Sequence, residues 1–154
     1  MDLILGNKPL LVGLHLAFSI TAIDLFIWLF GELVANSKAY KRIKAVGIGA
    51  VISLFLSWFF GGYYYVHYYG TLVKPVILKG AAPWAHAVFM EAKEHAFLFL
   101  VPIGLTLMFL TFLDKSEFSA SFSKYYKLLA LTAAGLGLVI GAMGFIISSA
   151  ARWG

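Results

Sequence analysis

Four histidines are the residues of this sequence best suited to chemistry. The chain contains His15, His67, His86 and His95 and no cysteine. Imidazole nitrogen binds haem iron, zinc, copper and non-haem iron, whereas the lack of cysteine excludes thiolate metal sites, iron–sulfur clusters and covalently attached c-type haem. The histidines therefore suggest either a b-type haem or a metal ion, depending on which of them the fold brings together.

Two carboxylates accompany the last histidine. Glu91 precedes His95 by four residues and Glu94 is its neighbour, so all three share one face of a helix. A carboxylate beside a ligand histidine can orient its ring or carry protons. The Glu-x-x-His spacing typical of di-iron sites is absent, because Glu91 and His95 are one residue further apart. The alternative interpretation is that these residues form a solvated helix end.

The composition shows which solvent surrounds these residues. Of the 154 residues, 62% are hydrophobic and 12% are charged, whereas a soluble domain is roughly 45–50% apolar and about 25% charged. A soluble fold of this size could not bury so much apolar surface. The composition therefore predicts an integral membrane protein, which we expect in the plasma membrane of a prokaryote.

Four apolar segments are long enough to cross a bilayer as helices. They cover about residues 9–33, 45–69, 84–113 and 125–150. We therefore predict a single all-α domain, a four-helix transmembrane bundle. The connections at 34–44 and 114–124 hold more Lys and Arg than the opposite side, so the positive-inside rule places both termini outside, N-out and C-out. The connection at 70–83 is expected to lie on the outer membrane surface or to form a short amphipathic piece.

Alternating passes place all four histidines toward the outer face. His86 and His95 are nine residues apart, which is about half a revolution of a regular helix. They are therefore expected to point to different sides, with His95 as the inward one because Glu91 accompanies it.

The first hypothesis for function is a small b-type cytochrome-like electron-transfer protein. Two of His15, His67 and His95 would be the axial ligands, and His86 would be needed only for a second haem. The aromatic walls of such a site would be Phe18, Phe59, Phe60 and Phe99. The small residues that leave room for the macrocycle would be Gly61, Gly62, Ala92 and Ala96, and the cations for its propionates would be Lys79 and Lys93.

Two alternatives remain open. The first is a non-haem site for a Cu, Zn or Fe ion, built from His15, His67, His95 and Glu91. The second is a structural or interaction subunit of a larger membrane complex, in which the histidines lie at the membrane interface. The sequence predicts no catalytic residue, and an enzymatic role is left open, with a redox subunit of an oxidoreductase as one interpretation.

Other features concern partners. Gly137 and Gly141 form a small-residue stripe that permits close helix contact, either within the bundle or in a homo-oligomer. Asp24 lies deep in the first helix, where it is expected to hydrogen-bond within the protein or to belong to a proton path. The basic residues lie in short loops rather than on one face, so no nucleic-acid interface is predicted despite the net charge of +5.

The outline of the chain resembles a family. With four helices, His15 within Leu14-His15-Leu16, and Trp84-x-His86 at the start of the third helix, the chain resembles the small four-helix b-type haem membrane proteins, among them the HemJ-like protoporphyrinogen oxidases. The resemblance implies haem between the helices and electron exchange with a quinone or a partner redox protein.

Overall fold

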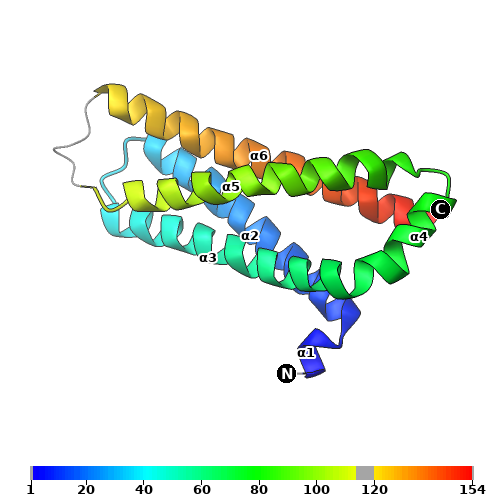
Figure 1. Cartoon of the computed structure of the whole chain (residues 1–154). Helices are drawn as coiled ribbons and strands as arrows, with labels where there is room; N and C mark the ends of the chain where they lie inside the picture. The colour runs from blue at the N-terminus through cyan, green and yellow to red at the C-terminus, as the bar shows by residue number, and fades with distance from the viewer. Residues whose placement is uncertain (1, 114–119, 154) are drawn as a thin grey trace.

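The structure, a computed structural model, describes residues 2–113 and 120–153, and no strand occurs among them. The chain reads as a series of helical elements with short links (Figure 1). In chain order these are α1 (Asp2–Leu5), α2 (Lys8–Val34), α3 (Tyr40–Tyr64), η1 (Tyr65–Val73), α4 (Lys74–Lys79), η2 (Ala85–Met90), α5 (Glu91–Leu110) and α6 (Ala120–Trp153).

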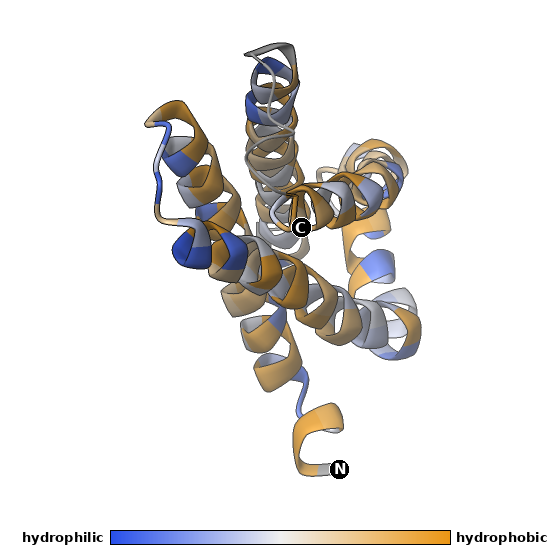
Figure 2. Cartoon of the chain, turned by 90° about the vertical axis from the view of Figure 1, so that its left-hand side faces the viewer, coloured by the Kyte–Doolittle hydropathy of each residue, from blue (hydrophilic) through white to orange (hydrophobic). Residues whose placement is uncertain are grey.

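Within the described residues, four helical stretches are long and apolar enough to cross a membrane. They are Lys8–Val34, Tyr40–Lys79, Ala85–Leu110 and Phe122–Arg152. Hydrophobic residues run along the helices, and hydrophilic residues concentrate near their ends (Figure 2). The prediction of an all-α integral membrane protein with four membrane-spanning helices is confirmed.

The chain runs back and forth between two ends of the bundle. Figure 1 shows both termini at one end, together with the link at residues 80–84, and we call this the terminal end. The link between α2 and α3, residues 35–39, lies at the opposite end, which we call the closed end. At the terminal end α2 diverges from α5 and α6, whereas at the closed end the helices lie near one another.

The second membrane helix continues ten residues beyond its predicted end at 69, to Lys79. The helix widens to a π-helix in η1 and then continues as α4. Pro75 lies in the first turn of α4, where a missing N–H is tolerated. The expected outer loop at 70–83 is therefore mostly helical, and only residues 80–84 link it to η2. Because this helix is longer than a bilayer requires, its α4 part turns across the terminal end (Figure 1).

Two hydrophobic clusters hold the bundle together. The larger lies toward the closed end and includes Phe26, Leu29, Leu54, Leu107 and Ala130. The smaller lies at the terminal end and joins η1, α4, η2 and α6 through Tyr69, Ile77, Ala85, Met90 and Ile147.

The small-residue stripe of the fourth helix is used inside the chain. A Cβ on Gly137 would lie 2.9 Å from Cγ1 of Ile23 in α2, and one on Gly141 would lie 3.8 Å from its Cδ1. Glycine therefore lets α2 and α6 pack closely. The expected contact at Gly137 is made within one chain, whereas Gly141 is exposed and the homo-oligomer stays a prediction.

Candidate functional site

His15 is the centre of a polar network between α2 and α3. Its Nδ1 lies 2.9 Å from the carbonyl oxygen of Ser57 and 3.1 Å from the Ser57 hydroxyl. Ser19, one turn further along α2, lies 2.7 Å from the Ser57 hydroxyl and donates to the His15 carbonyl at 2.7 Å. The imidazole is only partly exposed, and Ser57 is 3% exposed.

Counting protons fixes the state of the His15 ring. Because Ser19 uses its single hydroxyl proton on the His15 carbonyl, the Ser57 hydroxyl must donate to Ser19. The Ser57 oxygens can then only accept from His15, so Nδ1 carries a proton. In the neutral ring Nε2 therefore presents a lone pair. No described residue hydrogen-bonds to Nε2, which leaves this nitrogen available to a ligand.

A glycine on α3 makes room for the ring. A Cβ on Gly61 would collide with Nδ1 of His15 and would lie 2.7 Å from Cε1 and 3.0 Å from Cγ. We expected Gly61 to leave space for a cofactor, but the His15 ring itself occupies that space. The neighbouring Gly62 is different, because a Cβ there would meet only Trp58 at ordinary contact distance, 3.7 Å.

On α5 the inward residue is Lys93 rather than His95. The Nζ of Lys93 lies 3.5 Å from the position that a Cβ on Gly144 of α6 would take, and its charge acts electrostatically on His15. Lys93 forms no ion pair with any described residue. His95 is exposed, because it lies about 200° around the helix from Lys93. The expectation that His95 points inward is therefore wrong.

The other three histidines also have Nδ1 engaged. His95 bonds the Glu91 carbonyl of its own helix at 2.7 Å, and His67 bonds the Tyr63 carbonyl at 3.0 Å. The ring of His67 is also stacked on Tyr63, with centroids 4.1 Å apart. A carbonyl can only accept, so in both residues Nδ1 carries the proton and Nε2 is free.

His86 differs in having a side-chain partner. Its Nδ1 lies 2.9 Å from the hydroxyl of Tyr69, which is 5% exposed and belongs to the smaller hydrophobic cluster at the terminal end. This bond ties η2 to η1. His86 and His95 have different surroundings, but the nine-residue spacing does not give their angle, because His86 lies in the π-helical η2. With a buried tyrosine as its partner, His86 is best explained as a packing residue.

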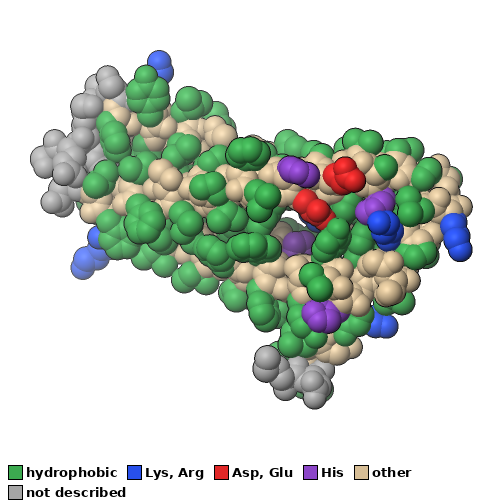
Figure 3. Space-filling model, viewed as in Figure 1, with side chains coloured by type: hydrophobic (Ala, Val, Ile, Leu, Met, Phe, Trp, Pro, Cys, Tyr) green, Lys and Arg blue, Asp and Glu red, His purple; other side chains and the backbone are tan. Residues whose placement is uncertain are grey.

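Acidic side chains and histidines gather around an opening. Figure 3 shows two acidic side chains and a histidine along one side of a gap between α3 and α5, and another histidine within it, in the half of the molecule nearer the terminal end. Glu94 reaches the hydroxyl of Tyr65 in η1 and also acts electrostatically on Lys93. Glu91 acts on Tyr65 more weakly. Carboxylates therefore act on Tyr65 and on Lys93 in this half of the bundle.

The histidines do not assemble into a metal-ion site. Among the residues that the structure describes, no group of three or more His, Asp or Glu side chains could hold a metal ion. His15, His67, His95 and Glu91 come from three helical elements, and the last three are exposed. The four-residue site for a Cu, Zn or Fe ion is therefore not formed, because the helix phases turn these residues outward.

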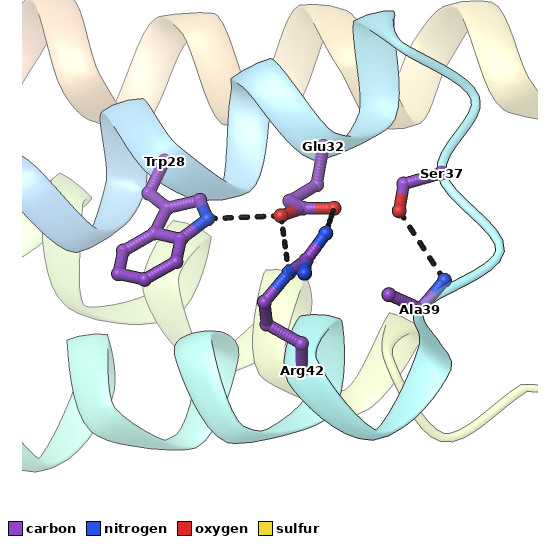
Figure 4. A network of polar contacts seen from close by, with 5 residues as sticks. All are labelled: Trp28, Glu32, Ser37, Ala39 and Arg42. Carbon is purple, nitrogen blue, oxygen red and sulfur yellow. Dashed lines mark hydrogen bonds and ion pairs between the residues drawn. The ribbon is translucent and has the colours of Figure 1, made fainter.

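At the closed end, a separate polar cluster was not anticipated from the sequence. Glu32 of α2 is 8% exposed and accepts from Nε and Nη2 of Arg42 at 2.6 and 3.0 Å, and from the indole of Trp28 at 2.9 Å (Figure 4). Next to it, the Ser37 hydroxyl accepts from the backbone N–H of Ala39 at 3.2 Å. Both oxygens of the Glu32 carboxylate have a donor, and the bond to Arg42 joins α2 to α3, which indicates a clamp between these helices.

These features define a class of protein: a four-helix integral membrane protein with a polar, histidine-containing site in one half of the bundle. The chain matches no protein-family model, no curated protein and no solved structure. The chemistry of the site is therefore the basis for any statement about its function.

Proposed function

We propose that this chain is a small b-type cytochrome-like protein in which haem would be held at the opening between α3 and α5, with His15 as one of the residues that would hold it. The observation that carries the proposal is the His15 network, in which Ser57 fixes the Nδ1 proton and leaves Nε2 for a metal. Ligand histidines in proteins are oriented by the same kind of bond.

The residues around the opening fit this group in further respects. The aromatic rings of Phe18 in α2 and Phe60 in α3 stack with centroids 5.8 Å apart, on the same two helices as His15 and Ser57, and offer an apolar wall. Lys93 supplies an inward ammonium without an ion-pair partner among the described residues, which suits a propionate carboxylate. Haem bound here would supply one-electron transfer, and its redox partner would be a quinone or another redox protein.

The second residue that would hold the haem is proposed to be His95, whose exposed ring lies on the outer side of α5, so that the group would lie at the mouth of the opening rather than inside the bundle. Its Nε2 is free, and its Nδ1 is fixed by the Glu91 carbonyl. His67 is the alternative, but its ring is already stacked on Tyr63. His86 is excluded from this role in the proposal because Tyr69 engages it. Since α2 and α5 are separate helices, a haem held by His15 and His95 would link them where the bundle diverges.

We further propose that the protein lies in the plasma membrane of a prokaryote, with the terminal end outside. The support is the distribution of basic residues, because the cytoplasmic side of membrane proteins carries the excess of Lys and Arg. Lys38, Lys41, Arg42 and Lys44 lie at the closed end. A haem near the terminal end would then exchange electrons with a partner at the outer leaflet.

Visible absorption of the purified full-length protein tests the proposal. We expect a Soret band that shifts on reduction with dithionite. His15→Ala and His95→Ala should each abolish it, whereas His86→Ala and His67→Ala should retain it. Circular dichroism of each variant checks that its helices remain. A colourless wild-type protein after expression with added haem would contradict the proposal, and bleaching by His67→Ala in place of His95→Ala would overturn the choice of the second ligand.

A further inference from the structure

Asp24 is an acidic residue that the proposed site does not use. It lies 16 residues after the start of α2 and 10 before its end, which at 1.5 Å per residue places it about 24 Å and about 15 Å from those ends. The hydrocarbon core of a bilayer is about 30 Å thick. Asp24 therefore lies within the hydrocarbon region, far from either surface.

The packing of its neighbours fixes the direction of Asp24. Ile23 packs on Gly137 of α6, and Leu25 lies 3.3 Å from the position of a Cβ on Gly49 of α3. Successive residues of a helix are about 100° apart, so the residue between these two points away from the bundle. Asp24 is exposed, and no described residue forms a hydrogen bond or an ion pair with it.

This orientation is unusual for a carboxylate at that depth. Ionisable residues in membrane helices normally face the bundle interior or a water-filled cavity and pair with another group. The sequence predicted a hydrogen bond within the protein or a place in a proton path; no described residue hydrogen-bonds to Asp24, and the proton path stays a prediction. Since no described residue partners the carboxylate, the lipid-facing side of α2 is where another molecule can meet it.

The charge indicates what that partner carries. A second copy of the chain would present another Asp24 on the same face. The described Lys and Arg side chains lie near helix ends, apart from Lys93, which turns inward toward Gly144. The described part of the chain therefore has no outward-facing cation to offer at this depth. The same face exposes Gly13 and Gly31, where an added Cβ would meet nothing within 4 Å, so another backbone can approach.

We infer that the outward face of α2 around Asp24 docks a transmembrane helix of a different protein, one that presents a Lys or Arg side chain at the same depth. The pair forms in lipid, where a carboxylate and an ammonium have no water to solvate them separately. This interface is independent of the haem proposal, because Asp24 points away from the side of α2 that carries His15.

The test uses the full-length protein in phosphatidylcholine vesicles with a poly-leucine transmembrane peptide that carries one central Lys. Energy transfer between labelled protein and labelled peptide measures their association. We expect the Lys peptide to associate about tenfold more tightly than a matched all-Leu peptide, the size of an interhelical polar contact in a bilayer. Asp24→Leu should remove that preference, and Ile27→Leu on the same helix should keep it.

Each other outcome overturns the inference. Equal association of both peptides, or a preference that persists in Asp24→Leu, would mean that Asp24 recruits no cationic helix. Energy transfer between two labelled copies that Asp24→Leu abolishes would show self-association instead. The Soret band of Asp24→Leu should equal that of the wild type, so failure of the docking proposal and failure of the haem proposal are distinguishable.

Discussion

The two ends of the bundle use polar residues in opposite ways. At the closed end, Glu32, Arg42 and Trp28 bond one another, and the carboxylate has three donors. At the terminal half, His15 has one ring nitrogen fixed and the other free, and Lys93 has no ion-pair partner among the described residues. A cluster whose charged groups have partners stabilises a fold, whereas polar groups with an unused lone pair or an unpaired charge are where a ligand can bind.

The backbone shows the same contrast. The helices at the closed end are regular and pack through the larger cluster, which includes Leu29 and Leu107. The terminal half contains both π-helical segments, η1 and η2, which hold His67 and His86. π-Helical insertions occur frequently at functional sites. The comparison suggests that the closed end keeps the helices together while the terminal half keeps space and chemistry available.

The largest expected effect comes from filling the space that His15 uses. Gly61→Ala places a Cβ where the imidazole lies, so the ring must move and lose its bonds to Ser57. We expect most of the haem absorbance to disappear while the helix content is retained. Gly62→Ala is the matched control, because its Cβ would make only an ordinary contact with Trp58, and it should leave the spectrum unchanged. Full absorbance in Gly61→Ala would refute this role of His15.

An intermediate effect should follow from breaking the closed end. Arg42→Ala removes two of the three donors to Glu32 and leaves a nearly buried carboxylate without its counter-ion. We expect the thermal midpoint in detergent to fall by several degrees with the Soret maximum unchanged. Lys41→Ala, at the neighbouring exposed position, should change neither. A loss of haem without a loss of stability would show that the two ends are not separate in function.

The smallest effect is expected from the Ser57 hydroxyl. Ser57→Ala removes the bonds to Ser19 and to His15 but keeps the backbone carbonyl that accepts from Nδ1. Each such hydrogen bond contributes about 1 kcal/mol net, so losing both should lower the free energy of unfolding by about 2 kcal/mol. The haem should remain bound, with a shift in its reduction potential because the ligand ring is less firmly oriented. Complete loss of haem would mean that the hydroxyl, not the carbonyl, positions His15.

Much of the fold could be predicted from hydropathy. The first membrane helix was expected at 9–33 and lies at Lys8–Val34, and the fourth was expected at 125–150 and starts at Ala120. The second was less predictable, because Gly70 and Pro75 read as a loop. The π-helical turn and the first-turn position of Pro75 let the helix continue instead. The expected loop at 114–124 falls in part on residues 114–119, which lie outside the described residues.

The candidate site was predictable only in part. Four alternating helices suffice to place His15, His67, His86 and His95 in the same half of the bundle, and this is where the structure has them (Figure 3). Ser19 and Ser57 were missed, although Ser19 follows His15 by one helical turn and Ser57 precedes Gly61 by one on α3. Those two spacings were the available signal.

The amino-acid sequence alone predicted that the chain is an integral membrane protein, that it crosses the bilayer as four helices, and that its four histidines lie in one half of the bundle. These properties depend on the composition, on the length of the apolar segments, and on the alternating direction of successive membrane helices. The tertiary structure decided that Lys93 faces inward, that His95 and Asp24 face outward, and that Gly137 packs on Ile23. Lipid and protein core are equally apolar, so hydropathy does not mark which face of a membrane helix is buried. That choice follows from packing between helices.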